Sequence, residues 1–231
     1  MTKAKSPRPK KIADIWTRVD DYIVDNLLAD DAALDAALRS SIAAGLPAIA
    51  VTPAQGRFLQ LLAEMIRARS VLEIGTLGGY STICFARALP PDGRIVTLEV
   101  DATHAEVARK NFGRAGVQGM IELRLGNALD TLPLLVAEQS RPFDLIFIDA
   151  DKQNIPAYFD WAMKLSHAGT VIIVDNVVRD GEVANARNKD ASVQGVRRFI
   201  RQIGRDKRIG ATALQTVGAK GYDGFAIARV R

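Results

Sequence analysis

The residues whose types could most clearly take part in chemistry are oxygen donors that follow two short apolar runs. Asp149 follows the run Leu145–Ile148, and Asp175 with Asn176 follows the run Val171–Val174. If both runs are adjacent parallel strands, their carboxyl ends share the edge of the sheet where open α/β folds bind ligands. Two carboxylates and an amide suit Mg²⁺ or a similar cation, whereas Zn²⁺ prefers nitrogen and sulfur ligands. The pattern predicts a magnesium site at Asp149, Asp175 and Asn176.

Lys152 lies three residues after Asp149 and is a candidate general base. Cationic neighbours, such as a bound metal ion, favour the neutral amine that can accept a proton. Structural alternatives exist for both residues. Lys152 can be a solvated surface lysine, and Asp149 and Asp151 can simply cap a helix that starts at Ile155.

A glycine-rich turn follows the first apolar run, within Val71–Ser81. A strand that ends in such a turn and opens a helix brings backbone N–H groups close to a ligand. The turn does not match the dinucleotide motif, because Leu77 and Tyr80 stand where glycine is required. No Gly-Lys-Ser/Thr sequence follows, so it is not an ATP-type phosphate loop either.

Two further acids accompany this turn. Glu73 precedes it by two residues, and Glu99 ends the next apolar run, Ile95–Leu98. In this class of fold a carboxylate at the end of the second strand can accept hydrogen bonds from both hydroxyls of a ribose. The alternatives are a loop acid that binds backbone N–H groups for Glu73 and a surface charge for Glu99.

The run Val71–Ser81 resembles the S-adenosylmethionine-binding loop of the cation-dependent O-methyltransferases of the catechol and caffeoyl-CoA type, roughly V-L-E-I-G-T-x-x-G-Y-S. The similarity covers the chain from about Ile49 to the C-terminus and continues at Gly126–Ala128, Leu132–Pro133, Phe143–Lys152 and Val174–Asn176. The resemblance implies an enzyme of class EC 2.1.1.- that transfers a methyl group from S-adenosylmethionine to a hydroxyl of a small catechol-like or phenolic acceptor. S-adenosylhomocysteine is the implied product, and Mg²⁺ or a similar cation is implied as cofactor.

The resemblance also implies roles for single residues. Lys152 and Asp149 would be catalytic, Glu73 would face the methionine amino group, and Glu99 would bind the ribose. Asp149, Asp175 and Asn176 would hold the cation. The implied cofactor-binding residues are Val51, Glu73, Gly75, Thr76, Ser81, Glu99, Ala128 and Asp149.

Two positions on the implied acceptor side depart from the family. Ile155 replaces a usual tyrosine, and Arg179 replaces the tryptophan of plant members. These departures argue against caffeoyl-CoA, the substrate of the plant members. Arg179 is either a contact for an anionic acceptor or a surface charge. Family analogy further suggests a homodimer with the N-terminal helices as its interface.

The elements that must position these residues follow an alternating pattern. It predicts a Rossmann-like, doubly wound, seven-stranded and mostly parallel α/β sheet with a C-terminal antiparallel hairpin and an N-terminal helical cap. We expect one domain, 12–231, after a flexible basic arm, 1–11. The expected strands are Val71–Ile74, Ile95–Leu98, Ile121–Leu125, Leu145–Ile148, Val171–Val174, Ala211–Val217 and Gly224–Val230. The expected helices are Ile12–Leu28, Asp31–Ala44, Ala54–Ala68, Ser81–Leu89, Thr103–Ala115, Leu129–Gln139, Ile155–Ser166 and Val193–Arg205.

Composition limits the remaining possibilities. The net charge of +5 comes from the arm: five of the 31 Lys and Arg residues lie in the first eleven positions, and the other 26 equal the 26 acids. An RNA methyltransferase or RNA-binding protein on the same fold is the alternative function, although no nucleic-acid motif accompanies the arm. The single Cys84 excludes an internal disulfide, and no stretch is apolar enough to span a membrane. We expect a cytoplasmic protein.

Overall fold

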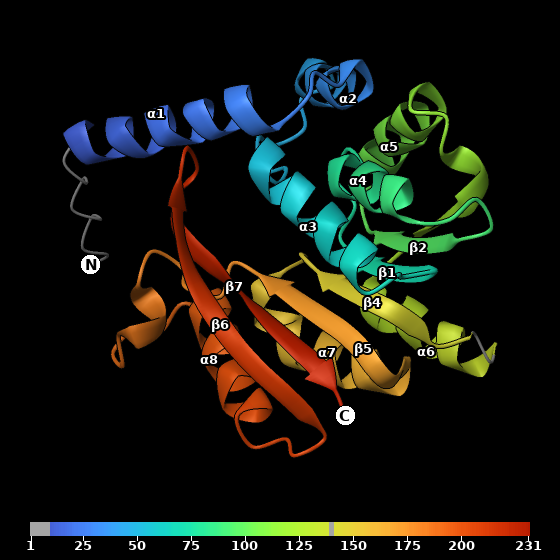
Figure 1. The fold of residues 1–231 in the computed structure, drawn as a ribbon. Coiled ribbons are helices and arrows are strands. Elements are labelled where there is room, and N and C mark those ends of the chain that lie inside the picture. Colours follow the sequence, from blue (N-terminus) through green and yellow to red (C-terminus); the bar gives the residue numbers. More distant parts are fainter. Residues whose placement is uncertain (1–9, 139–140) are drawn as a thin grey trace.

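The computed structural model describes residues 10–138 and 141–231 as a central sheet with helices on both faces (Figure 1). The helices are α1 (Lys10–Leu27), α2 (Ala32–Ala43), α3 (Pro53–Met65), α4 (Tyr80–Ala88), α5 (Ala102–Arg114), α6 (Ala128–Ala137), α7 (Ile155–Lys164) and α8 (Ala191–Ile203). Short 3₁₀ helices in the same residues are η1 (Gln118–Met120), η2 (Lys152–Asn154) and η3 (Glu182–Ala184). The strands are β1 (Ser70–Ile74), β2 (Arg94–Glu99), β3 (Ile121–Leu125), β4 (Phe143–Ile148), β5 (Ser166–Asp175), β6 (Ile209–Gly218) and β7 (Gly221–Val230).

Within the described residues, the sheet has seven strands in the order β3-β2-β1-β4-β5-β7-β6. The first five are parallel, and β7 runs antiparallel to both β5 and β6. The predicted fold is thereby confirmed. The C-terminal hairpin is tighter than predicted, because pairing continues to Gly218 and Gly221 and leaves a turn of Ala219 and Lys220.

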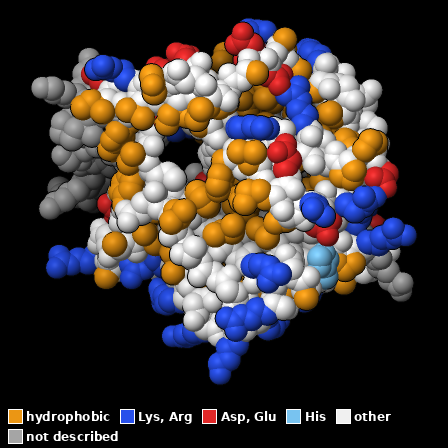
Figure 2. Space-filling view, viewed as in Figure 1, with side chains coloured by type: hydrophobic (Ala, Val, Ile, Leu, Met, Phe, Trp, Pro, Cys, Tyr) orange, Lys and Arg blue, Asp and Glu red, His pale blue; other side chains and the backbone are white. Residues whose placement is uncertain are grey.

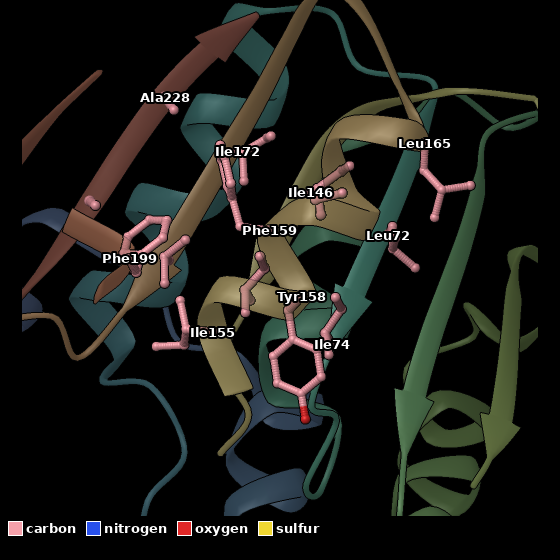
Figure 3. Packing of buried hydrophobic residues seen from close by; sticks show 14 of the residues in the cluster. Leu72, Ile74, Ile146, Ile155, Tyr158, Phe159, Leu165, Ile172, Phe199 and Ala228 are labelled. Atoms are coloured by element: carbon pink, nitrogen blue, oxygen red, sulfur yellow. The ribbon is translucent and has the colours of Figure 1, made fainter. Parts of the chain in front are cut away.

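Alternation along the strands divides the core into two layers. Val71 of β1 packs with α3 and α4, whereas its neighbour Leu72 packs on the other face with α6, α7 and α8. Figure 3 shows this second layer, in which Phe159 of α7 and Phe199 of α8 meet with ring centroids 5.5 Å apart. Burial on both faces explains why β1, β2, β4 and β5 appear in the sequence as short apolar runs, whereas the edge strand β3 is only partly buried and alternates with charged residues.

The N-terminal helices lie at one end of the sheet. Asp31 caps α2 by accepting hydrogen bonds from backbone N–H groups, and it also pairs with Arg87 of α4. Helix α1 crosses the tip of the β6–β7 hairpin, where Asp20 accepts a hydrogen bond of 2.7 Å from the backbone N–H of Ala219 (Figure 1).

Helix α1 begins at Lys10, so the last two positions of the predicted basic arm are helical. The rest of that arm, residues 1–9, lies outside the described residues. Across the part of the chain that is described, every helix is too short or too polar to cross a bilayer.

Candidate active site

A cavity of about 800 Å³ lies where the parallel strands end. Its walls come from the turn after β1, the end of β2, the start of α6, and the segments that follow β4 and β5. Strand order reverses between β1 and β4, and open α/β sheets bind their ligands at this kind of switch point. The volume is within the range of small-molecule sites.

Most of the residues predicted for the site line this cavity. Only Glu73 and Asp175, among those predicted, lie behind its wall. The residues on the wall are Val51, Gly75, Thr76, Ser81, Glu99, Ala128, Asp149, Lys152 and Asn176.

Gly75 allows β1 and β4 to approach each other at the cavity floor. Its φ is +100°, and a Cβ atom at this position would lie 2.3 Å from the carbonyl oxygen of Asp149. No other residue type fits both the backbone angle and the space. The glycine of the turn therefore serves the packing of the floor as well as access to a ligand.

Glu99 is held by the backbone around it. Its Oε2 accepts hydrogen bonds from the N–H groups of Thr76 at 3.2 Å and Leu77 at 2.7 Å. Its Oε1 accepts those of Val100 at 2.9 Å and Asp101 at 3.0 Å. The carboxylate is buried on the cavity wall, so the surface-charge alternative is wrong. These four hydrogen bonds use the roughly four lone-pair sites of a carboxylate, so a ligand hydroxyl bonded to Glu99 would share or replace one of them.

Glu73 is fully buried and lies behind Ser81 instead of on the wall. It accepts hydrogen bonds from the hydroxyls of Ser81 at 2.5 Å, Thr97 at 2.7 Å and Thr82. The pKa of Glu73 is raised from 4.5 to about 7, mainly by burial and to a smaller extent by the charge of Asp149, and the hydrogen bonds from the three hydroxyls oppose this rise. The alternative of a loop acid satisfied by backbone N–H groups is therefore wrong.

Sequence reasoning missed the two threonines that donate hydrogen bonds to Glu73, which are Thr82 and Thr97. Thr97 pairs with Glu73 in the register of β1 and β2, and its hydroxyl also lies 2.6 Å from that of Thr76. A polar residue inside the apolar run of β2 was the signal that would have found it. The hydroxyls of Thr97 and Thr76 therefore link Glu73 to the glycine-rich turn that follows β1.

Asp149 and Lys152 form an ion pair on the cavity wall, with 2.5 Å between Nζ and Oδ1. The side chain of Lys152 is only 10% exposed, so it is not the solvated surface lysine of the alternative interpretation. The capping alternative is also wrong. Asn154 precedes α7, and Asp151 accepts hydrogen bonds from the side chains of Asn154 and Tyr158.

The backbone of the Lys152 segment is packed against α8. A Cβ atom on Gly195 of that helix would lie 2.2 Å from the carbonyl oxygen of Lys152. This close contact restricts the segment and thereby fixes the position of the Lys152 backbone. Gly195 is a second contributor to the site that sequence reasoning missed.

Asp175 and Asn176 end β5 beside this pair. Asp175 accepts hydrogen bonds of 2.8 Å from the Gln55 side chain and from the backbone N–H of Asn176. Burial and the charge of Asp149 raise the pKa of Asp175 to about 6, and the charge of Lys152 opposes them. Lys220 in the hairpin turn also interacts electrostatically with both carboxylates.

The donor set fits a divalent cation of the hard class. Asp149 and Asp175 lie close enough for the charge of one to disfavour ionisation of the other, which a bound cation would relieve. All three predicted donors are oxygens, as Mg²⁺ prefers. Across the described residues, no group of three His, Cys, Asp or Glu side chains is placed to hold a metal, so a cation here depends on the Asn176 amide.

The expectation that Ile155 lies on the acceptor side is wrong. Ile155 is completely buried in the core layer beneath α7 (Figure 3), as is Phe159. Tyr158 lines the cavity instead, and its hydroxyl donates to Asp151. The aromatic residue at the wall is therefore Tyr158, three residues after the position where the family motif has a tyrosine. Arg179 does line the cavity.

The fold and the site define the class of protein. A doubly wound sheet with an acid at the end of β2, a glycine turn after β1 and a ligand cavity over both is the architecture of the Rossmann-like methyltransferases. A family model described as O-methyltransferase matches residues 27–229. The chain belongs to this O-methyltransferase family.

Similar proteins agree with this assignment. The chain is 52% identical over 217 residues to a catechol O-methyltransferase of Niastella koreensis, and the alignment covers 94% of this chain and 98% of the relative. It is 54% identical over 213 residues to a catechol O-methyltransferase of Mycobacterium tuberculosis, with 92% and 95% covered. The crystal structure of an O-methyltransferase from Bacillus cereus in complex with SAH (S-adenosylhomocysteine) superposes with a TM-score of 0.94 at 55% identity, over 95% of this chain and 100% of that one.

Proposed function

We propose that this protein transfers the methyl group of S-adenosylmethionine to a hydroxyl of a catechol-like acceptor with the help of a divalent cation. The observation that carries the proposal is the ion pair of Asp149 and Lys152 on the wall of the cavity, next to Asp175 and Asn176. Similarity to catechol O-methyltransferases and to a structure with bound S-adenosylhomocysteine supports the choice of donor and acceptor.

The cofactor end of the cavity is formed by the turn after β1 and by Glu99. Glu99 is the proposed acceptor of hydrogen bonds from the ribose hydroxyls. Val51, Thr76 and Ser81 are proposed to surround the methionine part, and Ala128 the adenine. Glu73 acts through Ser81, since its own oxygens are enclosed by hydroxyls.

Asp149, Asp175 and Asn176 are the proposed ligands of the cation, which when bound would favour the deprotonated form of the acceptor hydroxyl. The neutral amine of Lys152 is the proposed acceptor of that proton at Nζ, which requires that the bound cation replaces the ammonium group as the partner of Asp149. The reaction breaks the S–CH₃ bond of the donor and forms an O–CH₃ bond, which leaves S-adenosylhomocysteine. Since Lys152 is nearly buried and its segment is packed against Gly195, its amine is held in place before the acceptor arrives.

The decisive experiment is a calorimetric titration with S-adenosylhomocysteine followed by a methylation assay with 1,2-dihydroxybenzene. We expect a dissociation constant of about 1–50 μM, methylation in the presence of Mg²⁺, and loss of methylation with excess chelator. Asp149→Ala should lose turnover and keep its fold. Asp160→Asn, at an exposed carboxylate on α7, is the matched control. Full activity of Asp149→Ala would contradict the proposed metal role, and no cofactor binding at all would contradict the proposal as a whole.

We also propose a homodimer. Helix α1 exposes the apolar residues Ile15, Val19, Tyr22 and Leu27, and the edge strand β6 exposes Leu214 and Val217. Figure 2 shows hydrophobic side chains along α1 and over the middle of the same face. Apolar groups gathered in this way mark interaction surfaces. The alternative role in RNA binding depends on an arm that lies almost wholly outside the described residues, and no observation favours it.

A further inference from the structure

The segment after β5 has an unusual backbone. Asn176, Arg179 and Asp180 have φ angles of 58°, 55° and 58°, and Gly181 follows at 82°. Residues other than glycine adopt this left-handed conformation rarely. Such strain persists only where surrounding structure enforces it, and it is concentrated at ligand sites.

Strand β7 enforces the conformation. Oδ1 of Asp223 accepts hydrogen bonds of 2.9 Å from the backbone N–H groups of both Val178 and Arg179. The N–H of Val177 donates to the carbonyl of Gly224 at 2.9 Å. Strand β7 and the end of β5 therefore hold Arg179 on the wall of the cavity, where Asn176 and Lys152 also lie.

The guanidinium of Arg179 is incompletely paired. Its Nη1 lies 3.9 Å from Oδ2 of Asp223, too far for a hydrogen bond. Its Nε is buried, and it is the single buried side-chain nitrogen or oxygen in the described part of the chain without a hydrogen-bond partner. An unsatisfied buried donor is unfavourable, which favours a reorientation of the Arg179 side chain that brings Nε to a partner. The planar fork of a guanidinium matches a carboxylate, which accepts two parallel hydrogen bonds.

The sheet order indicates which ligand supplies this carboxylate. Glu99 ends β2 and Arg179 follows β5, with β1 and β4 between them. At about 4.8 Å per strand, the two residues are roughly 14 Å apart along the edge of the sheet. Asp149, Lys152 and Asn176 lie nearer to Arg179, on the side of β4 and β5. The anion at Arg179 therefore lies on the side of the proposed metal ligands, away from the ribose.

We propose that Arg179 binds a carboxylate of the methyl acceptor, so that the preferred substrates are catechols that carry an acid group. The inference rests on the proposed function and specifies the substrate class for the same site. The carboxylate of the cofactor's methionine part is the other source of the same chemistry, and the experiment must separate the two.

The test compares 3,4-dihydroxybenzoate with 3,4-dihydroxybenzamide, which share the ring and differ in charge. For Arg179→Gln we expect kcat/KM to fall about 10- to 30-fold with the acid, mainly through KM, and to change less than about 2-fold with the amide. Calorimetry on the protein loaded with S-adenosylhomocysteine and Mg²⁺ should show a similar loss of affinity for the acid. Arg179→Lys should recover part of the preference, because it retains the charge without the fork.

Arg187→Gln is the matched control, since Arg187 is an exposed arginine in the same connection and outside the cavity. Arg179→Asn is the second variant if the glutamine variant does not fold, because asparagine adopts left-handed backbone readily. Equal losses with both acceptors would overturn the inference in favour of a purely structural role. About 10-fold weaker binding of S-adenosylhomocysteine with an unchanged preference would overturn it in favour of the cofactor's carboxylate. If the unaltered protein methylates neither acceptor, the proposed function fails and this inference fails with it.

Discussion

The buried carboxyl of Glu73 makes the stability of the protein depend on pH in a direction opposite to that of most acids. The pKa of Glu73 is raised from 4.5 to about 7 in the folded protein, chiefly by burial. Between pH 4.5 and 7 the folded state therefore holds a proton that the unfolded state has released. Stability contributed at this site is present below pH 4.5 and is lost as pH rises to 7.

The magnitude follows from the pKa difference of about 2.5, which is equivalent to about 3 kcal/mol. Glu73→Gln removes the ionisation and keeps a side chain of the same size that can bond to the hydroxyls of Ser81, Thr82 and Thr97. We expect the variant without ligands to match the unaltered protein near pH 4.5. It should gain about 1.4 kcal/mol per pH unit relative to that protein and reach about 3 kcal/mol at pH 8.

Urea unfolding of both proteins at pH 5, 6, 7 and 8 measures this difference, and contributions from titrating groups that do not interact with Glu73 cancel in the subtraction. A difference that does not change with pH would refute the reasoning, as would a variant that is less stable at pH 8. We also expect the variant to bind S-adenosylmethionine more weakly, because the ionised carboxylate is the form that attracts the positive charges of that cofactor. Increased stability with reduced binding would be a trade-off of the kind found at functional sites.

Three other variants test separate parts of the structure. Lys152→Met should lower kcat by about 10²- to 10⁴-fold and change the affinity for S-adenosylhomocysteine by less than about 2-fold, and an unchanged kcat would exclude the role as base. Gly195→Ala should lower kcat with little change in helix content, measured by circular dichroism, since the added Cβ displaces the backbone of Lys152. Val19→Glu should convert the proposed dimer to a monomer in light scattering, with Leu134→Glu on α6 as the control; a monomeric unaltered protein would contradict the dimer.

Local patterns account for most of the fold. Short apolar runs between helical stretches predicted the ends of the parallel strands to within two residues, except that β5 begins at Ser166, five residues before its predicted start. Such runs are visible because strands buried on both faces carry continuous apolar sequence. The two glycines of the C-terminal turn placed the hairpin correctly. They did not indicate that pairing extends to Gly218 and Gly221.

The site could be located from the sequence for a related reason. Residues that follow consecutive parallel strands meet at one edge of the sheet, so Asp149, Asp175 and Asn176 could be grouped without coordinates. Resemblance of the glycine turn to a known cofactor loop then identified the ligand class. Ile155 was misplaced, because helical rotation at the start of α7 decides whether a side chain enters the core or the cavity.

By itself, the sequence determined the order of strands and helices, the edge of the sheet that binds ligands, and the residue types available there. Tertiary structure alone decided how those residues are held. Glu73 is enclosed because the register of β1 and β2 places Thr97 opposite it, and Asp175 is fixed by Gln55, which lies 120 positions away. Asp223 likewise reaches Arg179 from β7, 44 positions along the chain. Contacts between residues so far apart depend on the packing of whole elements, and no local pattern of residues records them.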